Sequence, residues 1–419
     1  MSAAPSAFAE HGFVVINNVI SPEICALLCQ KTLDRIVQII FANSDIDPAV
    51  FAKITFEELI HMFTDEKLRV DKLGPAGDKI MYRYGNSRRP LLSKSTGMAD
   101  QHYIPEVLEH IAFNPTLYQI ACELYGRTDL VFSAGLERLC FKSPGATAMD
   151  KHIDRSLFDD SCSHESGTVT QTSLSSSNYC NAAGEIIPRI QCLVTAAVDT
   201  TTDTNDVGGL CLLRNFHHYT NFAKHIFHPR TGLVPFPDVP ASWSRFFILP
   251  KDFDKTYLPP LVQLIQIYMS WCQGHTSDLA PSVQQMFTLC QQNGVTVPLE
   301  YKPISWYAVK LRPGDAVFWN YELPHFSRAN KTHTARVAFY YSTFPAGPGW
   351  FGSAINKWLS DQVKELRYSY GVQGNKFPTK AINPEERDYF AKHPDEAERV
   401  FQLIMSSELN QRLCGLLSW

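Results

Sequence analysis

Short apolar runs separated by turn-forming residues fill the middle of the chain and predict a series of β-strands. Pro-Gly and Gly-Gly pairs between several of the runs mark turns. A helical lead-in precedes this region, so we predict a mixed α/β (α+β) fold with a jelly-roll core over about residues 130–345 and helices packed on one side. The predicted strands cover residues 130–142, 147–155, 188–198, 209–214, 305–311, 315–320 and 334–343.

Apolar residues at helical spacing flank this strand region. After a buried strand within residues 12–20, Ser21 and Pro22 fit the N-cap and first position of a helix. The lead-in, residues 1–129, also contains predicted helices at 105–113 and 115–125, and the second ends at Gly126. Beyond the core, residues 350–419 contain predicted helices near 353–368, 384–392 and 395–415. We expect the amphipathic last face to pack against the N-terminal helices, with a homodimer contact as the alternative.

Residues 221–303 are the main irregularity in this plan. Two helices are predicted there, at 259–273 and 281–292. We interpret the segment as an insertion packed beside the mouth of the barrel, within a single catalytic domain covering residues 1–419. It either shapes substrate choice or supports an oligomer, and the sequence does not decide between these roles.

Composition indicates which partners and which cellular compartment to expect. The 419 residues carry a formal net charge of −4, which does not favour nucleic-acid binding through a broad basic surface, although a local basic patch remains open. Eleven cysteines without a Cys-x-x-Cys pair indicate reduced thiols. The N-terminus has no signal-peptide pattern, and no apolar run approaches the roughly 18 residues of a membrane span. We expect an intracellular protein, cytoplasmic or organellar, that is not secreted and has no membrane partner.

Candidate chemistry lies in two distant pieces of the chain. In an extended segment, His152 and Asp154 would point to the same face, since they are two residues apart. His325 would complete a set of two histidines and one carboxylate, which suits non-haem Fe(II) with positions open for O₂ and a co-substrate. Arg336, eleven residues after His325, offers a planar fork for the far carboxylate of a keto-acid.

Other motifs admit plainer interpretations. His393-Pro394-Asp395 repeats the spacing, but proline sits poorly in a central strand, so we reject it. His217 and His218 look structural. The basic, aromatic residues 79–94 form either a solvated strand edge or a lip that meets an anionic substrate. Residues 159–187, rich in Ser, Thr, Asn and Gly, form either a plain surface loop or a lid over the substrate.

The order of these motifs resembles the phytanoyl-CoA dioxygenase-like branch of the Fe(II)/2-oxoglutarate-dependent oxygenases. The resemblance runs from the N-terminal strand and the His-x-Asp pair, through Gly208-Gly209-Leu210 and the Pro-Gly-Asp turn at 313–315, to the lone His325 and Arg336. It implies a double-stranded β-helix (jelly-roll, cupin-like) core and iron bound by His152, Asp154 and His325. It also implies 2-oxoglutarate and O₂ as co-substrates, with ascorbate as an optional addition.

Arg336 would bind 2-oxoglutarate in such an enzyme. Members of the family often hold the other carboxylate of the co-substrate with a polar residue just before His-x-Asp or on the third strand. Asp150 occupies the first place, and an anion is a poor partner for a carboxylate. Gln191 and Thr195 on the third strand are therefore the main candidates, with Lys79 and Tyr82 as further ones.

Three functions follow. The first is a dioxygenase that hydroxylates or otherwise oxidises an unactivated C–H bond of a small organic substrate and releases succinate and CO₂. The alternative is an oxygenase acting on a macromolecule, such as a modified nucleic-acid base or a protein side chain. The third is a barrel that has lost catalysis and only binds ligands. An intact His-Asp-His set argues against the third, and the acidic net charge argues against nucleic acid.

Overall fold

The computed structural model describes the N-terminal region and most of the strand-rich centre. The described residues are 4–42, 54, 56–62, 65–75, 104–132, 138–154, 179–180, 186–187, 190–228, 231–237, 247–275, 278–345, 394–414 and 416–417. The predicted lip at 79–94, most of the predicted lid at 159–187, and the helices predicted at 353–368 and 384–392 lie outside these residues.

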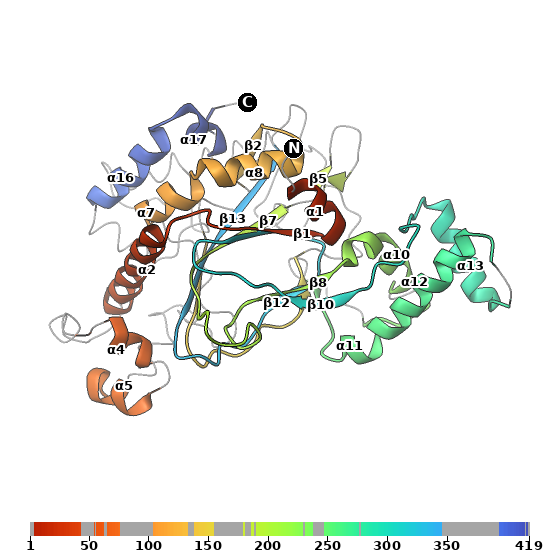
Figure 1. Cartoon of the computed structure of the whole chain (residues 1–419), viewed down its shortest axis with the longest axis horizontal. Helices are drawn as coiled ribbons and strands as arrows, with labels where there is room; N and C mark the ends of the chain where they lie inside the picture. The colour runs from red at the N-terminus through yellow and green to blue at the C-terminus, as the bar shows by residue number, and fades with distance from the viewer. Residues whose placement is uncertain are drawn as a thin grey trace.

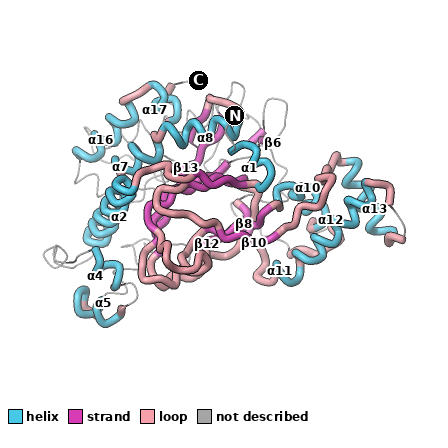
Figure 2. Tube along the Cα trace, in the orientation of Figure 1, coloured by secondary structure: helices cyan, strands magenta, loops and turns pink. Residues whose placement is uncertain are grey.

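Two antiparallel sheets form the centre of the molecule, as Figures 1 and 2 show. The six-stranded sheet has the order β1-β11-β7-β13-β2, and β3 also pairs with β13. The five-stranded sheet has the order β10-β8-β12-β4-β9. The strands of the first sheet are β1 (Phe13–Ile16), β2 (Leu130–Phe132), β3 (Arg138–Lys142), β7 (Ile190–Ala197), β11 (Ala316–Asn320) and β13 (Arg336–Pro345); those of the second are β4 (His152–Ile153), β8 (Leu210–Arg214), β9 (Phe247–Ile248), β10 (Ser305–Ala308) and β12 (His325–Ser327). A separate hairpin joins β5 (Tyr179–Cys180) to β6 (Ile186–Ile187).

Alternation along the strands divides the apolar residues into two cores. In β13, Val337 and Phe339 pack in a core shared with the N- and C-terminal helices. Ala338, between them, packs in a second core that contains Leu212 of β8 and Ile153 of β4. Since side chains of a strand point alternately to its two faces, the second core includes the interior between the two sheets, and it continues among the apolar residues of the helices within residues 216–292.

Helices cover the outer face of the six-stranded sheet. From the N-terminus they are α1 (Ala4–His11), α2 (Pro22–Ala42), α7 (Pro105–Val107), the π-helical turn η1 (Leu108–Ala112) and α8 (Pro115–Tyr125), while α4 (Phe56–His61) and α5 (Glu66–Leu73) extend beyond α2. Asn114 caps α8 by accepting hydrogen bonds from the N–H groups of Thr116 and Leu117, and Gly126 ends it in the left-handed conformation. These are the boundaries that the sequence predicts for this helix.

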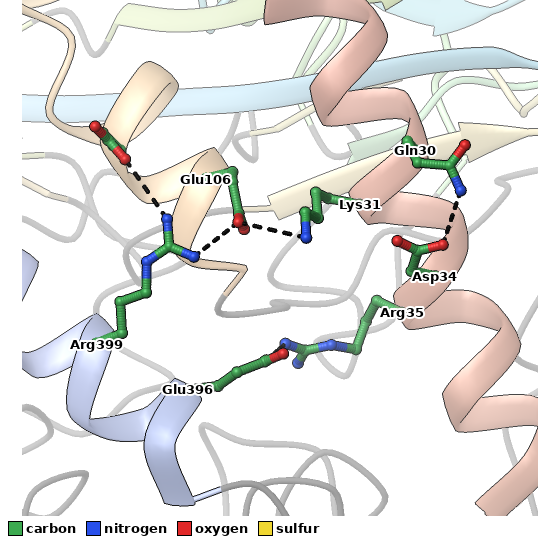
Figure 3. A network of polar contacts seen from close by, with 8 residues as sticks. Gln30, Lys31, Asp34, Arg35, Glu106, Glu396 and Arg399 are labelled. Atoms are coloured by element: carbon green, nitrogen blue, oxygen red, sulfur yellow. Dashed lines mark hydrogen bonds and ion pairs between the residues drawn. The ribbon is translucent and has the colours of Figure 1, made fainter.

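The C-terminal helices α16 (Pro394–Met405) and α17 (Glu408–Leu413) pack against the N-terminal ones, as expected. Val400 and Ile404 of α16 are buried in the outer core. Figure 3 shows the polar contacts around them: Arg399 Nη1 lies 2.8 Å from Glu106 Oε1 of α7, and Arg35 Nη2 of α2 lies 2.7 Å from Glu396 Oε2. The segment predicted as one helix over 395–415 is therefore two helices that close the helical layer.

The insertion contributes to the sheets as well as standing beside them. Its helices are α10 (Thr220–Ile226), preceded by the 3₁₀ turn η2 (Phe216–Tyr219), then α11 (Phe253–Thr256), α12 (Leu258–Cys272) and α13 (Pro281–Gln292). Figure 1 shows α12 and α13 at the end of the molecule opposite α2, α4 and α5. However, β9 also lies within the insertion and pairs with β4. The sequence analysis did not predict this pairing, because a two-residue strand is too short to stand out in the sequence.

Other strand predictions differ in extent. The run at 130–142 contains two strands, β2 and β3, and both pair with β13. The run at 147–155 contains only β4, which pairs with β12 at one position and with β9 at two. None of the helices among the described residues has both the length and the apolar character needed to cross a bilayer.

Candidate metal centre

The strands β4 and β12 bring the two predicted histidines together. They are antiparallel neighbours, and His152 is the register partner of His325. Asp154 follows β4 immediately, and its side chain reaches both imidazoles. His152 Nε2 lies 3.6 Å from Asp154 Oδ1, and His325 Nε2 lies 3.4 Å from Asp154 Oδ2. The pairing of two short strands therefore joins residues that are far apart in the sequence.

Each imidazole is oriented by a hydrogen bond to the backbone. His152 Nδ1 lies 2.8 Å from the carbonyl oxygen of Asp150, and His325 Nδ1 lies 2.9 Å from that of Leu323. A carbonyl only accepts, so both Nδ1 atoms donate, and in a neutral ring Nε2 then carries the lone pair. The two Nε2 atoms face Asp154. A hydrogen bond from the other ring nitrogen to a backbone carbonyl is typical of histidines that bind a metal.

The three side chains form a compact and buried group. One ligand atom from each of His152, Asp154 and His325 lies within 4.8 Å of the other two. The ring centroids of the histidines are 4.4 Å apart. Both histidines are buried, and the Asp154 side chain retains a little exposure. Among the described residues, this is the group of histidine, cysteine and acidic side chains with the arrangement of a metal site.

The electrostatics of the group favour a cation between the side chains. Burial and, to a smaller extent, the positive charge of His325 lower the pKa of His152 to about 4, so His152 is neutral at neutral pH. Burial would raise the pKa of Asp154, but His325, His152 and a hydrogen bond from Gln191 outweigh it and lower that pKa. Burial lowers the pKa of His325, yet the Asp154 charge and hydrogen bond raise it overall. The site thus presents an ionised carboxylate beside at least one imidazole lone pair.

Residues of the six-stranded sheet face the group of His152, Asp154 and His325 across the interior. Gln191 of β7 donates a hydrogen bond from Nε2 to Asp154 Oδ2, while its Oε1 is buried without a partner. Trp319 of β11, the register partner of Gln191, packs edge-on against His325 with ring centroids 5.7 Å apart. Gln191 thus orients the carboxylate, and the indole limits the movement of the imidazole.

Arg336 begins β13 and points into the same interior, because it lies on the face of Ala338. Its Nη1 donates to the carbonyl of Gly208 at 3.1 Å and contacts Cys140 Sγ at 3.7 Å. The hydroxyl of Thr195 is buried without a partner, and Thr195 lines a cavity together with Arg336. Gln191 and Thr195 therefore both face the interior, but at different ends of β7.

The remaining predicted histidines have structural contacts. His217 Nε2 lies 3.1 Å from the carbonyl oxygen of Ala9, and His218 Nε2 lies 2.8 Å from that of Glu10. They tie η2 to α1, as a structural interpretation requires. Pro394 and Asp395 of the rejected motif begin the helix α16, so they are not in a strand.

Lys142 was missed by the sequence analysis. It is completely buried at the end of β3 and is the register partner of Arg336. The available signal was its position: in Leu139-Cys140-Phe141-Lys142, the first and third residues alternate with the second and fourth, so the lysine shares the face of Cys140.

Comparison with known proteins gives remote structural likenesses. No family model and no curated protein matches the chain. The epimerase SnoN, in complex with Fe3+, alpha ketoglutarate and nogalamycin RO, is 11% identical with a TM-score of 0.37 over 82% of each chain. HygX from Streptomyces hygroscopicus, with nickel, 2-oxoglutarate and hygromycin B bound, is 13% identical with a TM-score of 0.38 over 82% of this chain and 87% of its own. AviO1 from Streptomyces viridochromogenes Tue57 is 16% identical with a TM-score of 0.37 over 83% of this chain and 96% of its own. Because the scores are low, the function proposed below rests on the side chains.

Proposed function

We propose that this protein is an Fe(II)/2-oxoglutarate-dependent dioxygenase of the phytanoyl-CoA dioxygenase-like branch, acting on an unactivated C–H bond of a small organic substrate. The observation that carries the proposal is the convergence of His152, Asp154 and His325, with their ligand atoms within 4.8 Å of one another, in an interior that also contains Arg336. Two imidazoles and one carboxylate are the donor set that suits non-haem iron with open positions.

The residues fit the metal on three counts. The carboxylate of Asp154 has a lowered pKa and is ionised, so it supplies negative charge. Both histidines direct Nε2 toward it, because their Nδ1 atoms donate to backbone carbonyls. If no cation is bound, the ionised and mostly buried carboxylate of Asp154 is stabilised by a proton shared with His325 and by the hydrogen bond from the amide of Gln191. His152, Asp154 and His325 would therefore hold the iron, and Arg336 would hold the co-substrate.

Bound iron and 2-oxoglutarate would together activate O₂ for oxidation of a C–H bond, with succinate and CO₂ as the co-products. The chain itself contributes binding and orientation. Gln191 holds the carboxylate of Asp154, Trp319 packs against the ring of His325, and the guanidinium of Arg336 offers donors to an anion. The apolar interior core around these groups excludes water, which protects the protein during oxidation.

The strand order supports a double-stranded β-helix. Taken in chain order, strands β3, β4, β7, β8, β10, β11, β12 and β13 fall into two sheets, β3-β13-β7-β11 and β4-β12-β8-β10. Each sheet thus alternates strands from the first and second halves of the core, as a jelly roll does. The ligand-bearing strands β4 and β12 are neighbours in the smaller set, with β9 of the insertion added outside β4.

Turnover in the absence of added substrate tests the proposal. With Fe(II) and 2-oxoglutarate, we expect the purified protein to release succinate slowly, and Asp154→Ala to abolish the release because the site loses its anionic ligand. His217→Gln, whose side chain contacts the backbone of α1, is the matched control and should retain turnover. Undiminished succinate release from Asp154→Ala would overturn the proposal.

A substrate comparison tests the class of substrate. Succinate release should rise when fractionated small metabolites are added and should not respond to nucleic acid, since the chain has a net charge of −4. Salt-dependent stimulation by nucleic acid or by an unmodified protein would instead support the macromolecular alternative.

A further inference from the structure

The interior contains a second charged group, at the end away from the metal-binding triad. Lys142 of β3 and Arg336 of β13 are register partners on neighbouring strands, and their side chains are 0% and 3% exposed. Lys142 lies on the face of Cys140, and Arg336 on the face of Ala338, both of which belong to the interior core. Two cationic side chains are therefore buried side by side between the sheets.

Lys142 crosses the interior to the strand that carries a metal ligand. Its Nζ donates to Ser327 Oγ at 2.9 Å and to the carbonyl oxygen of Ser327 at 3.4 Å. Ser327 lies two residues after His325 in β12, so the two side chains share one face and stand about 6.6 Å apart along the strand. The ammonium group and the metal centre are thus separated by about the length of a short carbon chain.

The described residues provide no anion for this pair of cations. None of their ion pairs includes Lys142 or Arg336. Asp315 lines the same cavity as Arg336, but its carboxylate accepts from the backbone N–H groups of Asn18 at 3.0 Å and Arg312 at 2.8 Å. Burial, together with the charge of Arg336, lowers the pKa of Lys142 to about 7. A buried charge without a counter-ion is unfavourable, and a bound anion would relieve it.

Gly208 fixes both cations in this arrangement. Its carbonyl accepts from Arg336 Nη1 at 3.1 Å, and a Cβ at this position would stand 3.1 Å from Cδ of Lys142. Its positive φ of 71° is one that glycine adopts readily. The loop before β8 therefore accepts a hydrogen bond from Arg336 and leaves no room for a larger residue beside Lys142.

A route for an anion also reaches this end of the interior. A cavity of about 990 Å³ is lined by Arg336 and Thr195, and its lining does not include His152, Asp154 or His325. The hydroxyl of Thr195 is buried and without a partner, so it is available as a further donor. The cavity thus reaches Arg336 and Thr195, and Lys142 is not among its lining residues.

We propose that Lys142 is a second cationic binding residue for the far carboxylate of a short dicarboxylate whose other end lies at the metal centre, with Arg336 as the first. This inference rests on the proposed function and adds to it a residue that selects the co-substrate by its second charge. A purely structural lysine would tie β3 to Ser327 of β12 but would not discriminate between dicarboxylates and monocarboxylates.

Binding of carboxylates to the Mn(II)-loaded protein, kept anaerobic, tests Lys142 without relying on turnover, because only a dicarboxylate can then reach the metal ion and the cationic pair together. We would titrate glutarate, which has two carboxylates but no keto group, and butyrate as the monocarboxylate, by calorimetry or thermal shift. Wild-type protein should bind glutarate at least tenfold more tightly than butyrate. Lys142→Met should lose most of this preference, Lys142→Arg should restore part of it, and the exposed Lys331→Met, whose Nζ pairs with Asp206 at 2.7 Å, should not change it.

Lys142→Gln is a second variant for the case in which Lys142→Met does not fold. Its amide keeps a hydrogen-bond donor toward Ser327 while the positive charge is removed. An unchanged glutarate preference in folded Lys142→Met or Lys142→Gln would overturn the role of Lys142. If these variants also release succinate with an unaltered KM for 2-oxoglutarate, only this inference fails. If wild-type protein neither prefers glutarate nor converts 2-oxoglutarate to succinate, the proposed function fails and the inference fails with it.

Discussion

The two ends of the interior differ in how their charges are balanced. At the metal end, the carboxylate of Asp154 lies between two imidazoles, with a hydrogen bond from Gln191. At the other end, Lys142 and Arg336 are adjacent and no described acidic side chain pairs with them. The donors at the metal end suit a cation, whereas the cationic end suits an anion. Under the proposed function, one ligand system would span the interior, with a metal ion at one end and a carboxylate at the other.

Substitution of His325, which is distant in sequence from His152 and Asp154, should have the largest effect. His325→Ala leaves two donors, so we expect the rise in thermal midpoint caused by Fe(II) or Mn(II) to vanish. For the wild type, a metal concentration one hundred times Kd would stabilise the fold by about 2.7 kcal/mol. Differential scanning fluorimetry, performed anaerobically for iron, measures the metal-induced rise in thermal midpoint for the wild type and for the variant. An equal metal-induced rise in the variant would show that the triad does not bind the ion.

At the cationic end, Arg336→Met should raise the KM for 2-oxoglutarate by about 10- to 100-fold, since hydrogen bonds to charged groups contribute roughly 1.5–3 kcal/mol. Arg336→Lys should be impaired as well, because an ammonium group lacks the planar fork. The stabilisation by Fe(II) should persist in both variants. A change in metal affinity as large as the change in KM would mean that the two ends are not separate binding sites.

The stability of the ligand-free protein should reveal the unbalanced charge of Lys142. Its pKa is 10.5 when unperturbed and about 7 in the fold, so below about pH 7 both folded and unfolded states are protonated and the whole cost of burying the charge is present. Between pH 7 and 10.5 the unfolded state binds more protons, so stability contributed by this group rises with pH. Lys142→Met removes the cost, which is about 5 kcal/mol at its upper limit.

We therefore expect Lys142→Met to have a higher thermal midpoint than the wild type at pH 6 and a smaller advantage at pH 9. The measurement is thermal denaturation without metal or carboxylate across this range. A variant that is less stable than the wild type at pH 6 would indicate that the hydrogen bond to Ser327 outweighs the cost of the charge. Saturating glutarate should reverse the order of the two proteins.

Gln191→Leu should have the smallest effect of these changes. The amide orients Asp154 but is not itself one of the metal-binding side chains, and loss of such a partner lowers metal affinity by about 10-fold. Competition with a chelator of known affinity would measure the change. A loss as severe as that in His325→Ala would assign Gln191 a direct part in binding the metal.

The metal end was the more predictable of the two from sequence. The side chains of His152 and Asp154 converge although the strand β4 has only two residues, because the direction of a side chain depends on local backbone geometry. The position of His325 opposite His152 depends on pairing between distant strands, and the sequence indicated it only through the order of motifs. The helix ends at Asn114 and Gly126 were predictable for the same local reason.

The cationic end was predictable only in part. Arg336 was identified by its separation from His325, but Lys142 looked like an ordinary strand end, since nothing local indicates that β13 will cover it. The pairing of β9 with β4 was missed because tertiary contacts, and not an apolar pattern, define so short a strand. The roles of Gln191 and Thr195 toward the co-substrate stay predictions, as does the single-domain organisation.

Fe(II) stoichiometry tests the central claim most directly. In anaerobic equilibrium dialysis, we expect one ion per chain for the wild type and for the double variant His217→Gln/His218→Gln, in which the other adjacent histidines are changed. Asp154→Ala should retain almost none under the same conditions. Full occupancy in Asp154→Ala, or loss of the ion in the double variant, would contradict a metal centre formed by His152, Asp154 and His325.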